Sequence, residues 1–190
     1  MESDAYRRIL ATAQDLFYRN GYRATGINEI IEKSGVAKAT FYAQFPSKES
    51  LALAYVKSMN EMETRNTEAG LAEYPGPYEK LLGFLEFLIV WSEERDYRGC
   101  AYLNISSEIP DAAHPVRQES KNHYRTLRAM IGRFMKELKV QRGEAWKDRD
   151  AEKVADDFML LFAGALALAQ VYHDSKPFRE AAAAARRILA

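Results

Sequence analysis

Cysteine, glycine and proline are scarce in this chain of 190 residues, and neither sign of charge is in excess. A single cysteine cannot form an internal disulfide, which excludes a small secreted scaffold held together by cross-links. The first residues lack the basic start and apolar stretch of a signal peptide, so we expect a cytoplasmic protein. The 27 Lys plus Arg balance 27 Asp plus Glu, and 47% of the residues are hydrophobic, which together exclude a disordered tail and a uniformly basic nucleic-acid coat.

Long hydrophobic runs and strand-like alternation are also missing. The longest near-continuous apolar run, from Phe158 to Ala169, is shorter than the roughly 18–20 residues that span a bilayer, so we expect no membrane association. Apolar residues instead recur every three or four positions, and the few glycines and prolines fall between such segments. The sequence therefore predicts an all-α protein.

The expected helices follow from this periodicity and from the breaks between segments. Three helices are expected near the N-terminus. The first begins at Ser3 or Asp4 and ends at Asn20, the second runs from about 27 to 34 with Thr25 as its cap, and the third runs from 36 to 45. A long helix capped by Ser47 follows, and later helices are expected at about 78–95, 100–109, 115–139, 151–173 and 177–189. The two short helices around Gly35 have the spacing of a helix-turn-helix.

The segment from Gly35 to Lys48 has the chemistry of a DNA-binding surface. It contains no acidic residue, two lysines supply positive charge, and hydroxyl and amide groups supply hydrogen bonds. Contacts of this kind to phosphates provide register and much of the affinity for DNA. Its alanines are small enough for the helix backbone to approach the major groove closely.

A dense set of motifs lies in the first 55 or so residues: Leu16-Phe17, Gly21-Tyr22, Thr25, Ile27 and Ile30, Gly35-Val36-Ala37, Thr40-Phe41-Tyr42, Phe45 and Ser47-Lys48-Glu49. This set resembles the DNA-binding segment of TetR-family transcriptional regulators. It implies a three-helix DNA-binding domain at 1–47 and a helical effector-binding and dimerisation domain at 48–190. It also implies that the residues facing DNA are Thr25, Ala37, Lys38, Ala39, Thr40, Tyr42, Gln44 and Lys48, with Thr25 and Lys48 holding phosphates. Phe41 and Phe45 are expected in the core.

The C-terminal helices carry stripes of aromatic residues and methionines that favour either a packed core or an apolar ligand cavity. TetR-like proteins commonly hold an effector among these helices. The candidates for effector contact are Met59, Met62, Phe84, Phe87, Trp91, Tyr102, Asn104, Tyr124, Phe134 and Phe158.

The run from Phe158 to Ala169 is apolar on every side, so a helix containing it must be covered all round. Its small residues allow close helix approach, which favours a homodimer built through a four-helix bundle. The alternative is a helix buried inside one subunit. The family resemblance also implies a dimer, whose two recognition helices would read a palindromic operator in double-stranded DNA.

Cys100 follows Arg98-Gly99 and begins a helix, where the helix dipole lowers a thiol pKa. It is therefore a candidate redox residue, and a small buried side chain is the alternative. His114, His123 and His173 lack the spacing of a zinc site, so neither a metal nor a cofactor is expected.

The leading functional hypothesis is a repressor that a small-molecule effector releases from its operator. Two alternatives stay open at this point. One is a repressor that senses electrophiles or oxidants through Cys100, and the other is an all-helical small-molecule-binding protein or enzyme with no role on DNA. No G-x-S-x-G, H-E-x-x-H, G-x-G-x-x-G or P-loop pattern is present, so we expect no enzymatic activity.

Overall fold

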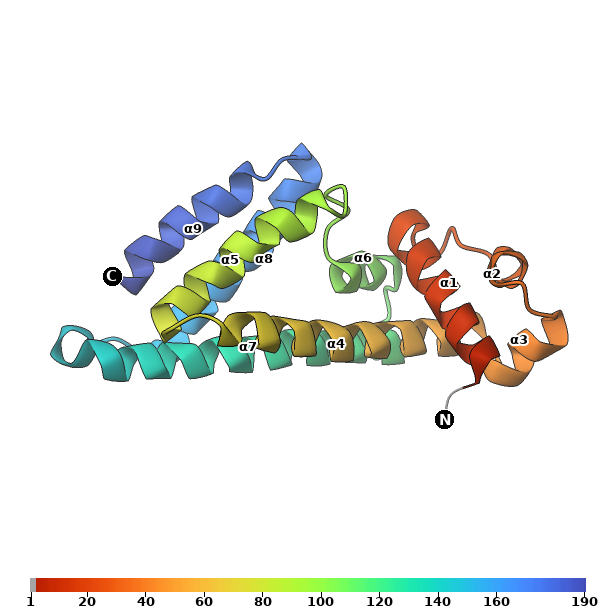
Figure 1. Cartoon of the computed structure of the whole chain (residues 1–190), viewed down its shortest axis with the longest axis horizontal. Coiled ribbons are helices and arrows are strands. Elements are labelled where there is room, and N and C mark those ends of the chain that lie inside the picture. The colour runs from red at the N-terminus through yellow and green to blue at the C-terminus, as the bar shows by residue number, and fades with distance from the viewer. Residues whose placement is uncertain (1–2) are drawn as a thin grey trace. The chain divides into compact units, whose positions relative to one another are not determined.

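The computed structural model describes residues 3–190, which form nine α-helices and one short 3₁₀-helix and contain no strand. The helices are α1 (Asp4–Asn20), α2 (Ile27–Ser34), α3 (Lys38–Gln44), α4 (Lys48–Ala72), α5 (Pro77–Glu93), α6 (Ala101–Glu108), α7 (Pro115–Arg142), η1 (Gly143–Trp146), α8 (Ala151–Tyr172) and α9 (Lys176–Leu189). Figure 1 shows their order along the chain. The all-α prediction is confirmed, and every expected helix is present within a few residues of its expected bounds.

The chain packs as two compact units. The first contains the residues up to Met62 together with Ala101–His123, and the second contains Glu63–Cys100 together with Tyr124–Ala190. The divisions fall inside α4 and α7, so each of these helices contributes residues to both units. This grouping by packing differs from the functional boundary at residues 47 and 48, which stays a prediction.

The first unit is built around a small core on which α1, α2 and α3 meet (Figure 1). Its buried side chains include Ile9, Leu16, Phe17, Ile30, Phe41, Leu51 and Tyr55. The rings of Phe17 and Tyr55 lie 5.7 Å apart, so α1 packs directly on the first turns of α4. Ser3 caps α1 by accepting the amide of Tyr6, as its position in the sequence predicts.

In the second unit α8 and α9 lie side by side and α5 packs against α9 (Figure 1). The largest side chains in its core include Phe84, Leu85, Trp146, Phe158, Phe162 and Phe178. The last carbonyls of α9 are bound by side chains from around η1, because Trp146 Nε1 donates to Ala190 O at 3.3 Å and Arg149 donates to Ile188 O at 2.6 Å. These bonds satisfy acceptors that the end of a helix leaves open.

α8 is the one helix in residues 3–190 that is long and apolar enough to cross a membrane on length and composition alone. Core helices of soluble proteins pass the same test, so this is weak support for a membrane role. Its inward face, with Phe158 and Ala165, is buried, whereas Leu160 and Val171 are 72% and 74% exposed. The helix is therefore covered on one side only within the single chain.

Candidate functional site

α3 exposes a surface of small and polar residues. Lys38, Ala39, Tyr42 and Ala43 are exposed, as is Ala37 just before the helix. Thr40 and Gln44 are half-exposed, and Phe41 and Phe45 point into the core. The prediction that these two phenylalanines lock the three-helix core is confirmed. Small side chains on an exposed helix without acidic neighbours suit a close approach to the major groove of DNA.

The position of α3 is fixed by contacts at both of its ends. Before it, Gly35 adopts φ +63° and ends α2, and the guanidinium of Arg8 donates to Ser34 O at 2.5 Å and to Gly35 O at 3.0 Å. After it, the ring of Phe45 stacks on Tyr6 with the ring centres 4.8 Å apart. α1 therefore holds both the turn and the far end of α3, which keeps the exposed surface of α3 rigid.

Gln44 is not a free side chain, because its Oε1 accepts a hydrogen bond from Ser3 Oγ at 3.1 Å. The same Ser3 hydroxyl caps α1. Nothing in the sequence links these two residues, which lie 41 positions apart and are brought together only by the packing of α1 on α3. Gln44 is thus pre-oriented at the end of the exposed surface.

The phosphate contact expected of Thr25 stays a prediction, and its side chain is engaged inside the protein. Thr25 is completely buried, and its hydroxyl donates to Gly21 O at 2.8 Å and to Leu16 O at 3.2 Å. It is also not the cap of α2, because Gly26 occupies that position and no side chain caps this helix. The Thr25 hydroxyl therefore closes the turn between α1 and α2.

Lys48 lies against that same turn. Its Nζ donates to Arg23 O at 3.3 Å and sits 4.6 Å from the centre of the Tyr22 ring. Burial lowers the pKa of Lys48, while the nearby Glu108 carboxylate acts in the opposite direction. Burial raises the pKa of the Tyr22 phenol, and Glu49 and Glu108 add to the effect. The lysine is positioned by the protein before any DNA arrives.

Glu108, at the end of α6, is a residue that reasoning from the sequence missed. Its Oε1 accepts the amide of Tyr22 at 3.0 Å, and its Oε2 accepts the amide of Arg23 at 2.6 Å. No local signal could have identified this contact, because 85 residues separate the carboxylate from the turn that it holds.

The candidate effector residues fall into both units. Met59, Met62, Tyr102 and Asn104 belong to the first, and Phe84, Phe87, Trp91, Tyr124, Phe134 and Phe158 belong to the second. In the second unit, Phe84 and Tyr124 approach Phe162, with ring centres 5.3 Å and 6.5 Å from it. Phe158 lies 6.4 Å from Phe84. Phe162 was not among the candidates, although it belongs to the apolar run that begins at Phe158.

The remaining candidates divide between exposed and buried positions. Phe87 and Met62 are 53% and 39% exposed, whereas Phe134 is buried. In the first unit, the ring of Tyr102 stacks on the imidazole of His123 at 3.7 Å with an angle of 11°. His123 Nδ1 lies 3.0 Å from Asn60 Oδ1, and burial lowers the pKa of this histidine to about 4. His123 is therefore a neutral, half-buried ring near neutral pH.

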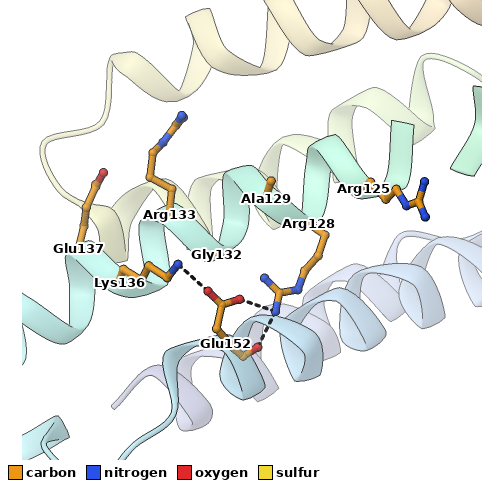
Figure 2. A pocket seen from close by; sticks show the side chains of 8 residues that line it. All are labelled: Arg125, Arg128, Ala129, Gly132, Arg133, Lys136, Glu137 and Glu152. Atoms are coloured by element: carbon orange, nitrogen blue, oxygen red, sulfur yellow. Dashed lines mark hydrogen bonds and ion pairs between the residues drawn. The ribbon is translucent and has the colours of Figure 1, made fainter. Parts of the chain in front are cut away.

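A hollow of about 580 Å³ lies on the second unit along α7 (Figure 2). It is lined by Arg125, Arg128, Ala129, Gly132, Arg133, Lys136, Glu137 and Glu152, and by none of the ten candidate effector residues. Figure 2 shows Arg128 and Lys136 directed at Glu152, at 2.8 Å and 2.7 Å, while Arg125 and Arg133 point away from it. Hydrogen bonds from Lys136 and Arg128 lower the pKa of the Glu152 carboxyl. The cations at the centre of this hollow are therefore already paired.

Cys100 is buried, with 7% of its surface exposed. The hydroxyl of Tyr124 donates a hydrogen bond to the sulfur of Cys100 at 3.5 Å. Burial is the main cause that raises the pKa of Tyr124, and the neighbouring Cys100 raises it further. Within residues 3–190, no three His, Cys, Asp or Glu side chains are arranged to hold a metal ion.

Two family descriptions match the chain in succession. Residues 9–55 match bacterial regulatory proteins of the tetR family, and residues 77–185 match the tetracyclin repressor-like C-terminal domain. The chain belongs to the TetR family. The first match covers the three-helix core with its exposed α3, and the second covers α5 to α9 almost completely. The resemblance stated from the N-terminal residues is confirmed and extends over most of the chain.

TetR-family relatives agree with this assignment. The HTH-type transcriptional regulator LmrA of Bacillus subtilis is 31% identical over 124 residues, a match that covers 64% of this chain and 66%, or just under two thirds, of LmrA. The HTH-type transcriptional repressor NemR of Escherichia coli is 21% identical over 194 residues, covering 100% of this chain and 96% of NemR. A TetR-family transcriptional regulator from Streptomyces coelicolor has the same fold, with a TM-score of 0.87 at 25% identity over 98% of this chain and 89% of that protein.

As a member of the TetR family, this protein is a DNA-binding transcriptional regulator and not an enzyme. TetR-family regulators bind operator DNA, are generally dimeric, respond to small-molecule effectors and are in general cytoplasmic. The third hypothesis, an all-helical protein with no role on DNA, is therefore wrong.

Proposed function

We propose that this TetR-family regulator is a repressor that binds a palindromic operator as a homodimer and is released from it by a small-molecule effector. The observation that carries the proposal is the exposed surface of α3, which lies in a segment without acidic residues and is held rigidly by Arg8 and Phe45. A rigid, small-residue helix with nearby lysines provides both close approach and phosphate attraction.

We expect DNA contact from the exposed and half-exposed residues at the recognition helix and the start of α4. These are Ala37, Lys38, Ala39, Thr40, Tyr42, Gln44 and Lys48. The first unit supplies this surface by itself, since α1 to α3 and the start of α4 all belong to it.

The apolar face of α8 supports the homodimer. Leu160, Leu168, Val171 and Tyr172 are 46% to 74% exposed in the single chain, and Gly164 and Ala167 lie between them without bulky side chains. The spacing of three and four residues places this set on one side of the helix. A twofold partner that presents the same face would cover it.

The aromatic cluster formed by Phe84, Tyr124, Phe158 and Phe162 supports an apolar or aromatic effector in the second unit. Aromatic side chains line most small-molecule sites and stack on flat ligands. The effector acts by binding one of two conformations of the regulator more tightly than the other, which shifts the population away from the form that binds DNA. Within the cluster, the hydroxyl of Tyr124 is a polar group, and it donates a hydrogen bond to Cys100 Sγ.

The thiol-sensing alternative is less well supported by the geometry. Reactive cysteines lie in partly exposed, electropositive surroundings, whereas Cys100 is buried and accepts a hydrogen bond from a tyrosine. We therefore place effector recognition in the aromatic cluster and treat Cys100 as a small core side chain.

The DNA-binding proposal is tested with duplexes from the region upstream of the protein's own gene, measured by fluorescence anisotropy at several salt concentrations. We expect Lys48→Ala to weaken binding and to reduce the salt slope by about one for each phosphate that the lysine no longer neutralises. Lys57→Ala, an exposed lysine further along α4, is the matched control and should leave the slope unchanged. Equal affinity of the wild type for upstream and random duplexes would contradict the proposal.

Effector release is tested with the substrates of enzymes encoded beside this gene, added to the preformed DNA complex. We expect one of these compounds to release the wild-type protein, and Phe162→Ala to raise the concentration required. If release occurs with the same midpoint in the variant, the effector does not contact the aromatic cluster.

A further inference from the structure

Both backbone polar groups of Arg23 are hydrogen-bonded to charged side chains. Its amide donates to Glu108 Oε2 at 2.6 Å, and its carbonyl accepts from Lys48 Nζ at 3.3 Å. The neighbouring amide of Tyr22 donates to Glu108 Oε1 at 3.0 Å. A carboxylate from α6 and an ammonium group from α4 thus form hydrogen bonds to the backbone of one turn between α1 and α2. Hydrogen bonds with a charged partner are stronger than those between neutral groups.

The turn is shaped to receive this carboxylate. Gly21 has φ +95°, a conformation that side chains disfavour, and a Cβ at this position would lie only 2.8 Å from Glu108 Oε1. The glycine therefore provides both the backbone conformation and the space that Glu108 occupies. Thr25 closes the same turn from inside through its bond to Gly21 O, so a hydrogen bond joins the first and last residues of the segment from Gly21 to Thr25.

The charge of Glu108 has the wrong sign for a residue that contacts DNA. A carboxylate near phosphates is repelled, and its negative charge partly offsets the positive charge of Lys48. Simple electrostatics predicts that removing it would strengthen DNA binding. Its two hydrogen bonds to backbone amides predict the opposite, because without them the turn and the lysine that rests on it lose their fixed position.

We infer that Glu108 is a positioning residue for operator binding, which acts by holding the Tyr22–Arg23 turn and, through it, Lys48. This inference rests on the DNA-binding role of the family and is independent of the proposed effector. It assigns to the last residue of α6 a part in DNA recognition without any contact to DNA.

The test compares Glu108→Gln with Glu61→Gln, which removes the same charge from an exposed residue of α4 in the same unit. We expect Glu108→Gln to weaken operator binding about tenfold, which corresponds to about 1.4 kcal/mol. Glu61→Gln should leave affinity unchanged or slightly tighter. Equal or tighter binding by Glu108→Gln would overturn the inference.

Amide hydrogen exchange in the free protein separates a positioning role from general destabilisation. In Glu108→Gln the amides of Tyr22 and Arg23 should exchange faster, while the amides of α1 and α3 keep wild-type protection. Faster exchange throughout the first unit would show a merely structural role and overturn the inference. Glu108→Asp keeps the charge but shortens the side chain, so it should show the same local change to a smaller degree. It replaces Glu108→Gln in this experiment if the Gln variant does not fold.

A double-mutant cycle with Lys48→Met tests whether Glu108 and Lys48 act together on the backbone of Arg23. We expect the loss of affinity in the double variant to be clearly smaller than the product of the two single losses. If the loss of affinity in the double variant equals the product of the two single losses, Glu108 and Lys48 act independently and this part of the inference is overturned. If the wild type itself shows no preference for the operator, the proposed repressor function fails as well. If it binds and Glu108→Gln matches the Glu61→Gln control, only the inference on Glu108 fails.

Discussion

The apolar face of α8 leads to a quantitative prediction for Leu160→Glu. Leu160 is 72% exposed in the single chain, and complete burial of a leucine side chain contributes about 1.5–3 kcal/mol. A twofold dimer covers two copies, so this position contributes about 2–4 kcal/mol to association. Losing that contribution raises the dimer dissociation constant by a factor of roughly 30 to 1000. The introduced carboxylate adds a desolvation cost, so we expect the upper end of this range.

Sedimentation velocity over a range of protein concentrations measures the change directly. The wild type should sediment as a dimer, and Leu160→Glu as a monomer at concentrations where the wild type is fully associated. Val140→Glu is the matched control, because Val140 is 82% exposed on α7 and is not on the α8 face. The monomeric variant should also lose most of its affinity for a palindromic operator, since each half-site is then bound independently.

Two results would refute the reasoning. A dimer of wild-type stability in Leu160→Glu would show that α8 is not the interface. Equal dissociation in Leu160→Glu and Val140→Glu would show that added charge, and not the removal of a specific apolar side chain, separates the subunits.

Three further predictions concern the interior of each unit. Phe158→Ala, at a side chain with no exposed surface, should lower the free energy of unfolding by about 3–5 kcal/mol in urea titrations, and a loss below about 1 kcal/mol would contradict the packing described. Burial holds the pKa of His123 at about 4, against about 6.5 in the unfolded chain, so the unfolded state binds the proton first. The stability from this residue should be complete above pH 6.5, fall by about 3 kcal/mol as the pH decreases to 4, and be absent from the pH profile of His123→Gln. Cys100→Ser should release DNA in the presence of N-ethylmaleimide no differently from the wild type, since the buried thiol is unreactive; release of the wild type alone would favour thiol sensing.

Several features of this protein could be predicted from the sequence because they depend on neighbours in the chain. The period of three to four apolar residues, the Ser3 and Ser47 caps and the glycine after Ser34 define helices whose bounds the structure reproduces within a few residues. The inward direction of Phe41 and Phe45 and the outward direction of Lys38 and Tyr42 follow from the same period.

The role of Thr25 shows where local reasoning fails. A threonine before a helix has the pattern of a cap, but here Gly26 takes the cap position and the hydroxyl bonds back to Gly21 O and Leu16 O. These two carbonyls lie within hydrogen-bonding distance of the Thr25 hydroxyl only because the turn folds back over the end of α1. The competition between these partners is decided by packing, which the order of residues does not reveal.

The set of helices, the family and the small, acid-free surface of α3 can all be predicted from the chain alone, because they arise from residues within one or two helical turns of each other. The burial of Thr25, the bond from Ser3 to Gln44, the gathering of aromatic residues around Phe162 and the grip of Glu108 on the turn before α2 emerge only in the folded protein. Each of these depends on side chains that are distant in sequence, and they meet only once the helices have packed.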